Sequence, residues 1–241
     1  MPKPRLDRWM VDHGLIESRE KAQALIMAGE VLLNGQKASK PGQPVPDDAR
    51  IEVLTRQKYV SRGGLKLEAA LHEFRINVTG FVCADFGSST GGFTDCLLQH
   101  GAAEVYAIDV GTNQLDWRLR NDPRVIVHEG VNARYLETDV IAEPVDLSVC
   151  DVSFISATMI LPAMIRVLKP FGSMVVLVKP QFEVGRDQVG KGGIVREPEL
   201  HQMACDKVRE FVAAQGFETA MMESPITGAE GNKEFLLHAH R

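Results

Sequence analysis

The strongest constraint on the fold is an alternation, from residue 81 onward, between short apolar, β-branched runs and stretches with helical spacing. Strands buried on both faces and separated by helices predict βαβ units in a mostly parallel, doubly wound α/β sheet. In such a sheet ligands bind beyond the carboxyl ends of the strands, where the strand order reverses. The residues at these ends are therefore the first candidates for a functional site. The expected strands are 81–86, 105–109, 125–128, 145–151 and 173–179.

The first of these strands leads into a glycine-rich turn, DFGSSTGGF at 85–93, and a helix is expected to begin near Thr94. Glycines let a ligand approach the backbone, and a helix N-terminus offers free N–H groups. The turn has neither the Gly-Lys-Ser/Thr of a P-loop nor the G-x-G-x-x-G spacing of dinucleotide sites. Asp109 ends the next strand, 17 residues after Gly92, where a carboxylate can bind a ribose diol. S-adenosylmethionine and NAD both fit this pattern, and so does a plain tight connection. The candidate cofactor-binding residues are Asp85, Gly87, Ser88, Ser89, Thr90, Gly91, Gly92, Phe93, Asp109 and Asp151.

A smaller α+β module is predicted ahead of this sheet. An apolar stripe beginning at Leu6 predicts a short helix, and a second helix is expected between the N-cap Ser18 and Gly29. Asn34-Gly35 fits a two-residue hairpin turn, and 50–54 reads as a further strand. We therefore expect domains at 1–55 and 61–241, joined by a short basic linker at 56–60.

Charge is distributed unevenly between these two parts. Residues 1–60 hold 10 lysines and arginines against 8 acidic residues, whereas residues 61–241 hold 17 against 24. The basic excess lies in the smaller module, where four cations fall outside the apolar stripes and could face phosphates. An ordinary solvated charged face fits the same pattern. The four cations are Arg5, Arg8, Arg19 and Lys21.

Several classes of protein do not fit the sequence. No apolar run approaches the roughly 18 residues of a membrane helix, and no secretory signal is visible at the N-terminus, so we expect a cytoplasmic protein without a membrane partner. The four cysteines are widely spaced, which argues against a structural metal site. We expect no metal.

Short motifs carry a resemblance to known families. RLD at 5–7, SREKA at 18–22 and VLLNG at 31–35 resemble the S4-type RNA-binding domain, and DFGSSTGGFT resembles the cofactor loop of FtsJ-type ribose 2′-O-methyltransferases. The order of the two domains resembles the TlyA family, also called haemolysin A-like proteins, along essentially the whole chain. Further matching stretches are VSRGGLKL at 60–67, CDVSFIS at 150–156, VKPQFE at 178–183, VGKGGIVR at 189–196 and GNKEF at 231–235.

The resemblance implies a Rossmann-like, S-adenosylmethionine-dependent methyltransferase domain that follows an S4-type RNA-binding domain. It also implies 2′-O-methylation of a cytidine in ribosomal RNA, with the RNA or a ribosomal subunit as partner. The family contains members that modify the large subunit only and members that modify both, the latter with extended ends. Because the first helix begins by Arg5 and the sequence stops at Arg241, we expect large-subunit RNA.

The family's catalytic pattern Lys-Asp-Lys-Glu falls on Lys66, Asp151, Lys179 and Glu234. Lys179 ends an apolar strand, where desolvation favours the neutral amine that proton transfer needs. We expect Lys179, held by Asp151 and Glu234, to be the base or to stabilise the alkoxide, and Lys66 to orient the hydroxyl and the adjacent phosphate. A strand-end lysine in water, a helix-capping Asp151 and a solvated Glu234 are the alternatives.

The glycine-rich segment 182–196 follows the strand that carries Lys179. Its glycines disfavour a stable helix, and its cations suit a mobile lid that clamps phosphates. With Arg62, which lies off its helix's apolar stripe, Lys191 and Arg196 complete the predicted RNA-binding residues. Two other functions remain open at this stage, a catalytically silent RNA-binding protein and a membrane-lytic haemolysin.

Overall fold

The computed structural model describes residues 3–54, 58–136, 140–228 and 230–241. The chain forms two compact units, Met1–Gln57 and Lys58–Arg241. Residues 56 and 57 of the expected linker lie outside the described residues. Its remainder belongs to the second unit, since Tyr59 is buried there and the N–H of Val60 donates to the Asp95 carboxylate at 2.8 Å.

The first unit pairs two helices with a small antiparallel sheet, as its sequence predicts. Its elements are α1 (Leu6–Asp12), α2 (Arg19–Met27), β1 (Val31–Leu33), β2 (Gln36–Lys37) and β3 (Ile51–Val53), with sheet order β2-β1-β3. Ser18 caps α2 by accepting from the N–H of Lys21. Asn34 and Gly35 both have positive φ, as a type I′ turn requires, and so fix the β1–β2 register. The core includes Leu6, Met10, Ala22, Ile26 and Val31.

The second unit is built on a sheet that, in the described residues, has seven strands in the order β6-β5-β4-β7-β8-β10-β9. Strands β4 to β8 run parallel, while β10 is antiparallel to both β8 and β9. The strands are β4 (Val82–Phe86), β5 (Glu104–Asp109), β6 (Val125–Glu129), β7 (Val145–Cys150), β8 (Leu168–Val178), β9 (Glu218–Glu223) and β10 (Phe235–His240).

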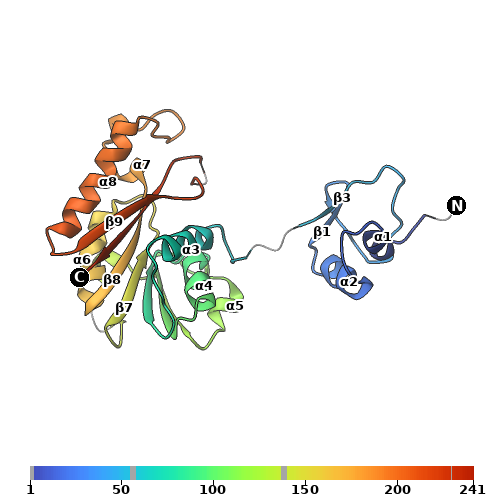
Figure 1. Cartoon of the computed structure of the whole chain (residues 1–241), viewed down its shortest axis with the longest axis horizontal. Helices are drawn as coiled ribbons and strands as arrows, with labels where there is room; N and C mark the ends of the chain where they lie inside the picture. The colour runs from blue at the N-terminus through green and yellow to red at the C-terminus, as the bar shows by residue number, and fades with distance from the viewer. Residues whose placement is uncertain (1–2, 55–57, 137–139, 229) are drawn as a thin grey trace. The chain divides into compact units, whose positions relative to one another are not determined.

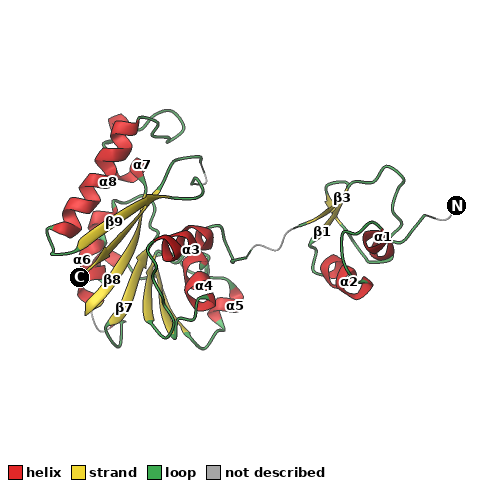
Figure 2. Ribbon diagram, in the orientation of Figure 1, coloured by secondary structure: helices red, strands yellow, loops and turns green. Residues whose placement is uncertain are grey.

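Helices cover both faces of this sheet (Figures 1 and 2). Because successive strand residues point to opposite faces, Ala84 and Phe86 of β4 pack against one layer while Cys83 packs against the other. The first layer contains α6 (Leu161–Val167) and α8 (Pro198–Ala213), and the second contains α3 (Gly63–Glu73), α4 (Gly92–Gln99) and α5 (Trp117–Arg120). No helix among the described residues is long and apolar enough to cross a membrane.

The predicted doubly wound α/β fold is thus confirmed, with two differences. The fifth predicted strand begins at Leu168 rather than residue 173, and its pairing with β7 contains a register shift between Val145 and Leu147. The hairpin β9–β10 was not predicted. Its strand β10 lies between β8 and β9, so Glu234, which directly precedes β10 and is buried, does not occupy a solvated edge position.

Candidate active site

The strand order reverses between β4 and β7. The residues that follow these two strands lie in close contact. Gly87 follows β4 and Asp151 follows β7. A Cβ atom added to Gly87 would lie 2.7 Å from the Asp151 carbonyl oxygen, and Gly87 has φ +83°. Only glycine therefore fits here without displacing the neighbouring strand end.

Asp85, the penultimate residue of β4, lies beneath the glycine-rich turn. Its Oδ2 accepts hydrogen bonds from the backbone N–H of Thr94 at 3.0 Å and from the Thr94 hydroxyl at 2.7 Å. The side chain is fully buried, and this burial raises the pKa of Asp85 to about 7. Asp85 lines neither of the two pockets described below. Asp85 therefore holds the start of α4 from behind the turn. Its predicted contact with a cofactor stays a prediction.

Gly91 is the second predicted cofactor residue that lines neither pocket. Its φ is +96°, and an added Cβ would lie 2.3 Å from Leu119. The residue serves the close packing of the turn against α5.

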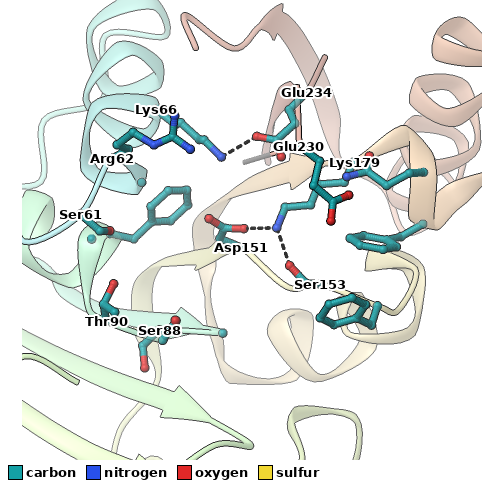
Figure 3. A pocket seen from close by; sticks show the side chains of 18 of the residues that line it. Ser61, Arg62, Lys66, Ser88, Thr90, Asp151, Ser153, Lys179, Glu230 and Glu234 are labelled. Carbon is teal, nitrogen blue, oxygen red and sulfur yellow. Dashed lines mark hydrogen bonds and ion pairs between the residues drawn. The ribbon is translucent and has the colours of Figure 1, made fainter. Parts of the chain in front are cut away.

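A pocket of about 580 Å³ opens beside the turn, at the carboxyl ends of β4, β7 and β8 (Figure 3). Its lining comes from segments distant in the sequence, namely the start of α3, the turn, the segment after β7, the segment after β8 and the residues before β10. Many of the residues predicted from the sequence contribute to this lining. The predicted site residues in this lining are Arg62, Lys66, Gly87, Ser88, Ser89, Thr90, Gly92, Phe93, Asp151, Lys179 and Glu234.

The four predicted catalytic residues form two ion pairs facing this pocket (Figure 3). Lys179 Nζ lies 2.6 Å from Asp151 Oδ1, and Lys66 Nζ lies 2.5 Å from Glu234 Oε2. Glu234 is buried and pairs with Lys66, so the expectation that it holds Lys179 is wrong. Nor is Lys179 a strand-end lysine in water, because its side chain is about nine-tenths buried, as is that of Lys66 on α3. Burial of four charges is tolerated because each is paired.

Ser153 is a pocket residue that the sequence reasoning missed. Lys179 Nζ donates to Ser153 Oγ at 2.8 Å, in addition to its ion pair with Asp151. Both partners sit in the segment that follows β7. An ammonium has three N–H groups, so these two contacts leave one for a substrate.

Two aromatic residues, Phe154 and Phe182, also line this pocket. Phe154 is 91% exposed and has φ +67°, which is rare for a bulky residue. Its ring centroid lies 5.4 Å from that of Phe182. The motif CDVSFIS contains Phe154. Its residue type and spacing do not reveal that the backbone has a positive φ or that the ring is exposed.

A second pocket of about 460 Å³ shares Gly87, Ser89, Asp151, Ser153 and Phe154 with the first. Asp109 lines it, together with apolar residues that include Ile108, Val131 and Ile155. The carboxylate of Asp109 accepts from the N–H of Ser89 at 2.8 Å and from the N–H of Gly111 at 2.7 Å. These amides fix the carboxylate at the end of β5 beside an apolar recess.

The predicted RNA-binding cations of the first unit are all ion-paired. Arg5 and Arg19 both bind the buried carboxylate of Asp7, at 2.9 Å and 3.0 Å, while their own side chains are about half exposed. Arg5 holds the pKa of Asp7 well below its usual range, with help from Gln23 and Arg19. The remaining pairs are Arg8 with Asp12 and Lys21 with Glu17.

The glycine-rich segment 182–196 is more structured than expected. It includes the end of α7 (Pro180–Glu183) and the 3-10 turn η4 (Arg186–Gln188). The buried side chain of Asn232 accepts from the N–H of Val195 and donates to the carbonyl of Gly193. Lys191 and Arg196 line neither pocket, although Val189 and Gly193 line the first. The role of residues 182–196 as a lid stays a prediction. In the structure the C-terminal part of this segment is held by Asn232.

No cluster of three metal-ligating side chains occurs in the parts of the chain that the structure describes.

Comparison with known proteins matches two families. Residues 59–241 match the family described as FtsJ-like methyltransferase, and residues 4–51 match the S4 domain. Hemolysin A of Brachyspira hyodysenteriae is 46% identical, over 97% of this chain and 98% of its own length.

Two further relatives are named as enzymes. The 16S/23S rRNA (cytidine-2'-O)-methyltransferase TlyA of Mycobacterium tuberculosis (strain ATCC 25618 / H37Rv) is 45% identical, over 98% of this chain and 89% of its own. The 23S rRNA (cytidine-2'-O)-methyltransferase TlyA of Campylobacter jejuni subsp. jejuni is 35% identical, over 92% of this chain and 93% of its own.

Among solved structures, an S-adenosylmethionine-dependent methyltransferase from Mesorhizobium loti superposes with a TM-score of 0.53 at 16% identity, covering 72% of this chain and 96% of its own. At that identity the likeness concerns the fold alone.

Proposed function

The chain belongs to the FtsJ-like methyltransferase family and carries an S4 domain ahead of the methyltransferase domain, and from this we propose that it transfers a methyl group from S-adenosylmethionine to the ribose 2′-hydroxyl of a cytidine in ribosomal RNA. The resemblance to the TlyA family stated from the motifs is confirmed by the full-length relatives. The observation that carries the proposal is the pair of buried ion pairs, Lys179–Asp151 and Lys66–Glu234, facing one pocket beside the glycine-rich turn.

The residues around the two joined pockets fit S-adenosylmethionine. Asp109 is placed to accept from a ribose diol, with apolar side chains such as Ile108 and Val131 beside it for a base. Ser88 and Thr90 offer polar groups in the adjoining pocket, near the start of α4. The bound cofactor would supply a methyl group on a sulfonium centre.

The chain's own residues must position a ribose hydroxyl and manage its proton, because a hydroxyl is a poor nucleophile. The Lys179 Nζ atom contacts Asp151 and Ser153, and its remaining valence can face the ribose hydroxyl. There Lys179 either takes the proton as an amine or stabilises the alkoxide as an ammonium. Asp151 neutralises the positive charge in both cases.

The second ion pair has a supporting role. Lys66 is fixed by Glu234 at the opposite side of the pocket, and Arg62 lies one helical turn before it. Together they suit the phosphate next to the target ribose. The rings of Phe154 and Phe182 offer stacking surfaces for an unstacked base at the same mouth.

The substrate class rests on the relatives and on the first unit. Both TlyA enzymes are named for 23S rRNA, and one is named for 16S rRNA as well. We therefore propose 23S rRNA as the substrate, which implies action in the cytoplasm. Arg5 and Arg19, fixed by Asp7 with half-exposed guanidinium groups, support binding of RNA phosphates.

The test is methyl transfer from labelled cofactor to 23S and 16S rRNA, with the product mapped by mass spectrometry. The wild-type protein should place one methyl group on a cytidine ribose. Lys179→Met should lower turnover by about 10²- to 10⁴-fold, the range for a proton-transfer residue, with unchanged cofactor affinity. Lys169→Met, at the other end of the same strand, is the matched control. Normal turnover of Lys179→Met would exclude this role, and transfer to a base nitrogen or carbon would exclude the ribose.

A further inference from the structure

Glu183 is a buried carboxylate that the mechanism above does not use. Its side chain is 1% exposed, although it sits only four residues after Lys179 on the short helix α7. An ionised carboxylate is rarely buried this deeply without a definite set of partners.

The partners of Glu183 that the structure describes belong to two segments, residues 156–157 and helix α8. Its Oε2 accepts from the Ser156 hydroxyl at 2.5 Å, and its Oε1 accepts from the backbone N–H of Ala157 at 2.6 Å. Lys207 of α8 lies 3.0 Å from the same carboxylate and also donates to the Glu183 carbonyl. The first two contacts fasten the end of the segment that follows β7, at the start of the 3-10 turn η3 (Ala157–Met159).

The other end of that segment is fastened by Lys179, through Asp151 and Ser153. Residues 151–157 therefore form an arch held at both ends by one piece of chain, 179–183. Between the two attachments stands Phe154, with φ +67° and an exposed ring. A strained backbone of this kind persists only where its surroundings fix it.

We propose that Glu183 is a positioning residue for methyl transfer: it fixes the arch 151–157, and through the arch it places the Ser153 hydroxyl against Lys179 and the Phe154 ring at the mouth of the pocket. This inference rests on the proposed function for its effect on turnover. Its structural part, the fastening of the arch, does not.

The test compares Glu183→Gln with Glu210→Gln, the same chemical change at an exposed glutamate on α8. The amide loses the ion pair with Lys207 and can no longer accept two hydrogen bonds in the present geometry. We expect kcat for methyl transfer to fall about 10- to 100-fold, as for a misplaced reacting group, while KM for RNA changes less than about threefold. Amide hydrogen exchange should accelerate within 151–157 and remain unchanged in β4 and β5.

A double variant separates positioning from general destabilisation. Ser156→Ala should lower kcat in the same direction, and adding it to Glu183→Gln should cost much less than the product of the two single effects. If Glu183→Gln does not fold, Ser156→Ala alone decides, and wild-type turnover with wild-type exchange in 151–157 overturns the proposal. If the wild-type protein methylates no RNA, the proposed function fails, while the exchange measurement still decides whether Glu183 holds the arch.

Discussion

Asp7 in the first unit and Asp85 in the second are both fully buried, yet their pKa values shift in opposite directions. Arg5 donates two hydrogen bonds to Asp7, further donors come from α2, and the pKa of Asp7 falls well below its usual range. Among the described residues Asp85 accepts only from Thr94, and burial raises its pKa to about 7. The partners of a carboxylate, more than its depth, decide its charge.

A buried aspartate therefore has a different structural role in each of the two units. In the first, Asp7 fixes two arginines whose side chains are about half exposed. In the second, Asp85 holds the start of α4 under the glycine-rich turn and brings no cation with it. The first arrangement suits a surface for polyanions, and the second suits a rigid cradle for a small ligand.

The largest expected effect concerns Asp85 and pH. Because its folded pKa lies above the ordinary value near 4, Asp85 contributes stability that is complete below about pH 4 and is lost as pH rises through 7. A rise from 3.8 to about 7 corresponds to about 4 kcal/mol. The melting temperature of the second unit should therefore fall between about pH 4 and pH 7. Asp85→Asn keeps a neutral acceptor for Thr94 and should flatten this dependence in calorimetry. Equal pH dependence of the two proteins would show that Asp85 is ionised when folded.

The sequence could predict the arrangement of the second unit because local patterns specify it. Alternating apolar runs gave the parallel strands, and the glycine-rich turn gave the start of α4 within two residues. The hairpin β9–β10 was missed because β9, with the sequence ETAMME, has only partly buried and exposed positions and pairs solely with β10. Such pairing depends on contacts distant in sequence.

The candidate site, too, could be predicted from the sequence only in part. The motif positions of Lys66, Lys179 and Glu234 were identified, but their pairing was not, since Lys66 and Glu234 are 168 residues apart. Ser153 and Glu183 escaped notice for a related reason. Neither residue type stands out in the sequence. Their partners lie 26 and 27 residues away along the chain and become neighbours only in the folded structure.

The second prediction tests the other carboxylate. Asp7→Asn removes the charged acceptor of Arg5 and Arg19, and a hydrogen bond to a charged group contributes about 1.5 to 3 kcal/mol. Because both arginines are half exposed and stay solvated, we expect a total cost of about 3 kcal/mol rather than the sum over all contacts. Hydrogen exchange of peptides from residues 3–54 in the full chain should accelerate, with exchange in the second unit unchanged. Asp47→Asn, at an exposed position of the same unit, is the control. Wild-type exchange in Asp7→Asn would remove the organising role of this carboxylate.

The third prediction asks whether a carboxylate at the rim of the second unit serves a ligand directly. Asp109 lines the smaller pocket, whereas Asp85 does not. Asp109→Ala should weaken S-adenosylmethionine binding by about 2 kcal/mol, within the range for a charged hydrogen bond. Titration calorimetry measures this, and Asp122→Ala, which removes a carboxylate outside both pockets, should bind normally. Unchanged affinity of Asp109→Ala would restrict Asp109 to holding the amides of Ser89 and Gly111.

The smallest expected effect concerns the cations that the first unit presents. Arg19→Glu would set a second carboxylate beside Asp7, so Arg19→Gln with Lys21→Gln is the better probe, because glutamine can still donate to Asp7. Each phosphate contact releases about one counterion, and the double variant should lower the salt slope of RNA affinity by up to about 2. Filter binding at several salt concentrations measures the slope, with cofactor affinity unchanged. Lys233→Gln, an exposed lysine of the second unit, should keep the wild-type slope. If the double variant keeps it as well, the face that Asp7 organises does not contact phosphates, and the contrast between the two units is one of stability alone.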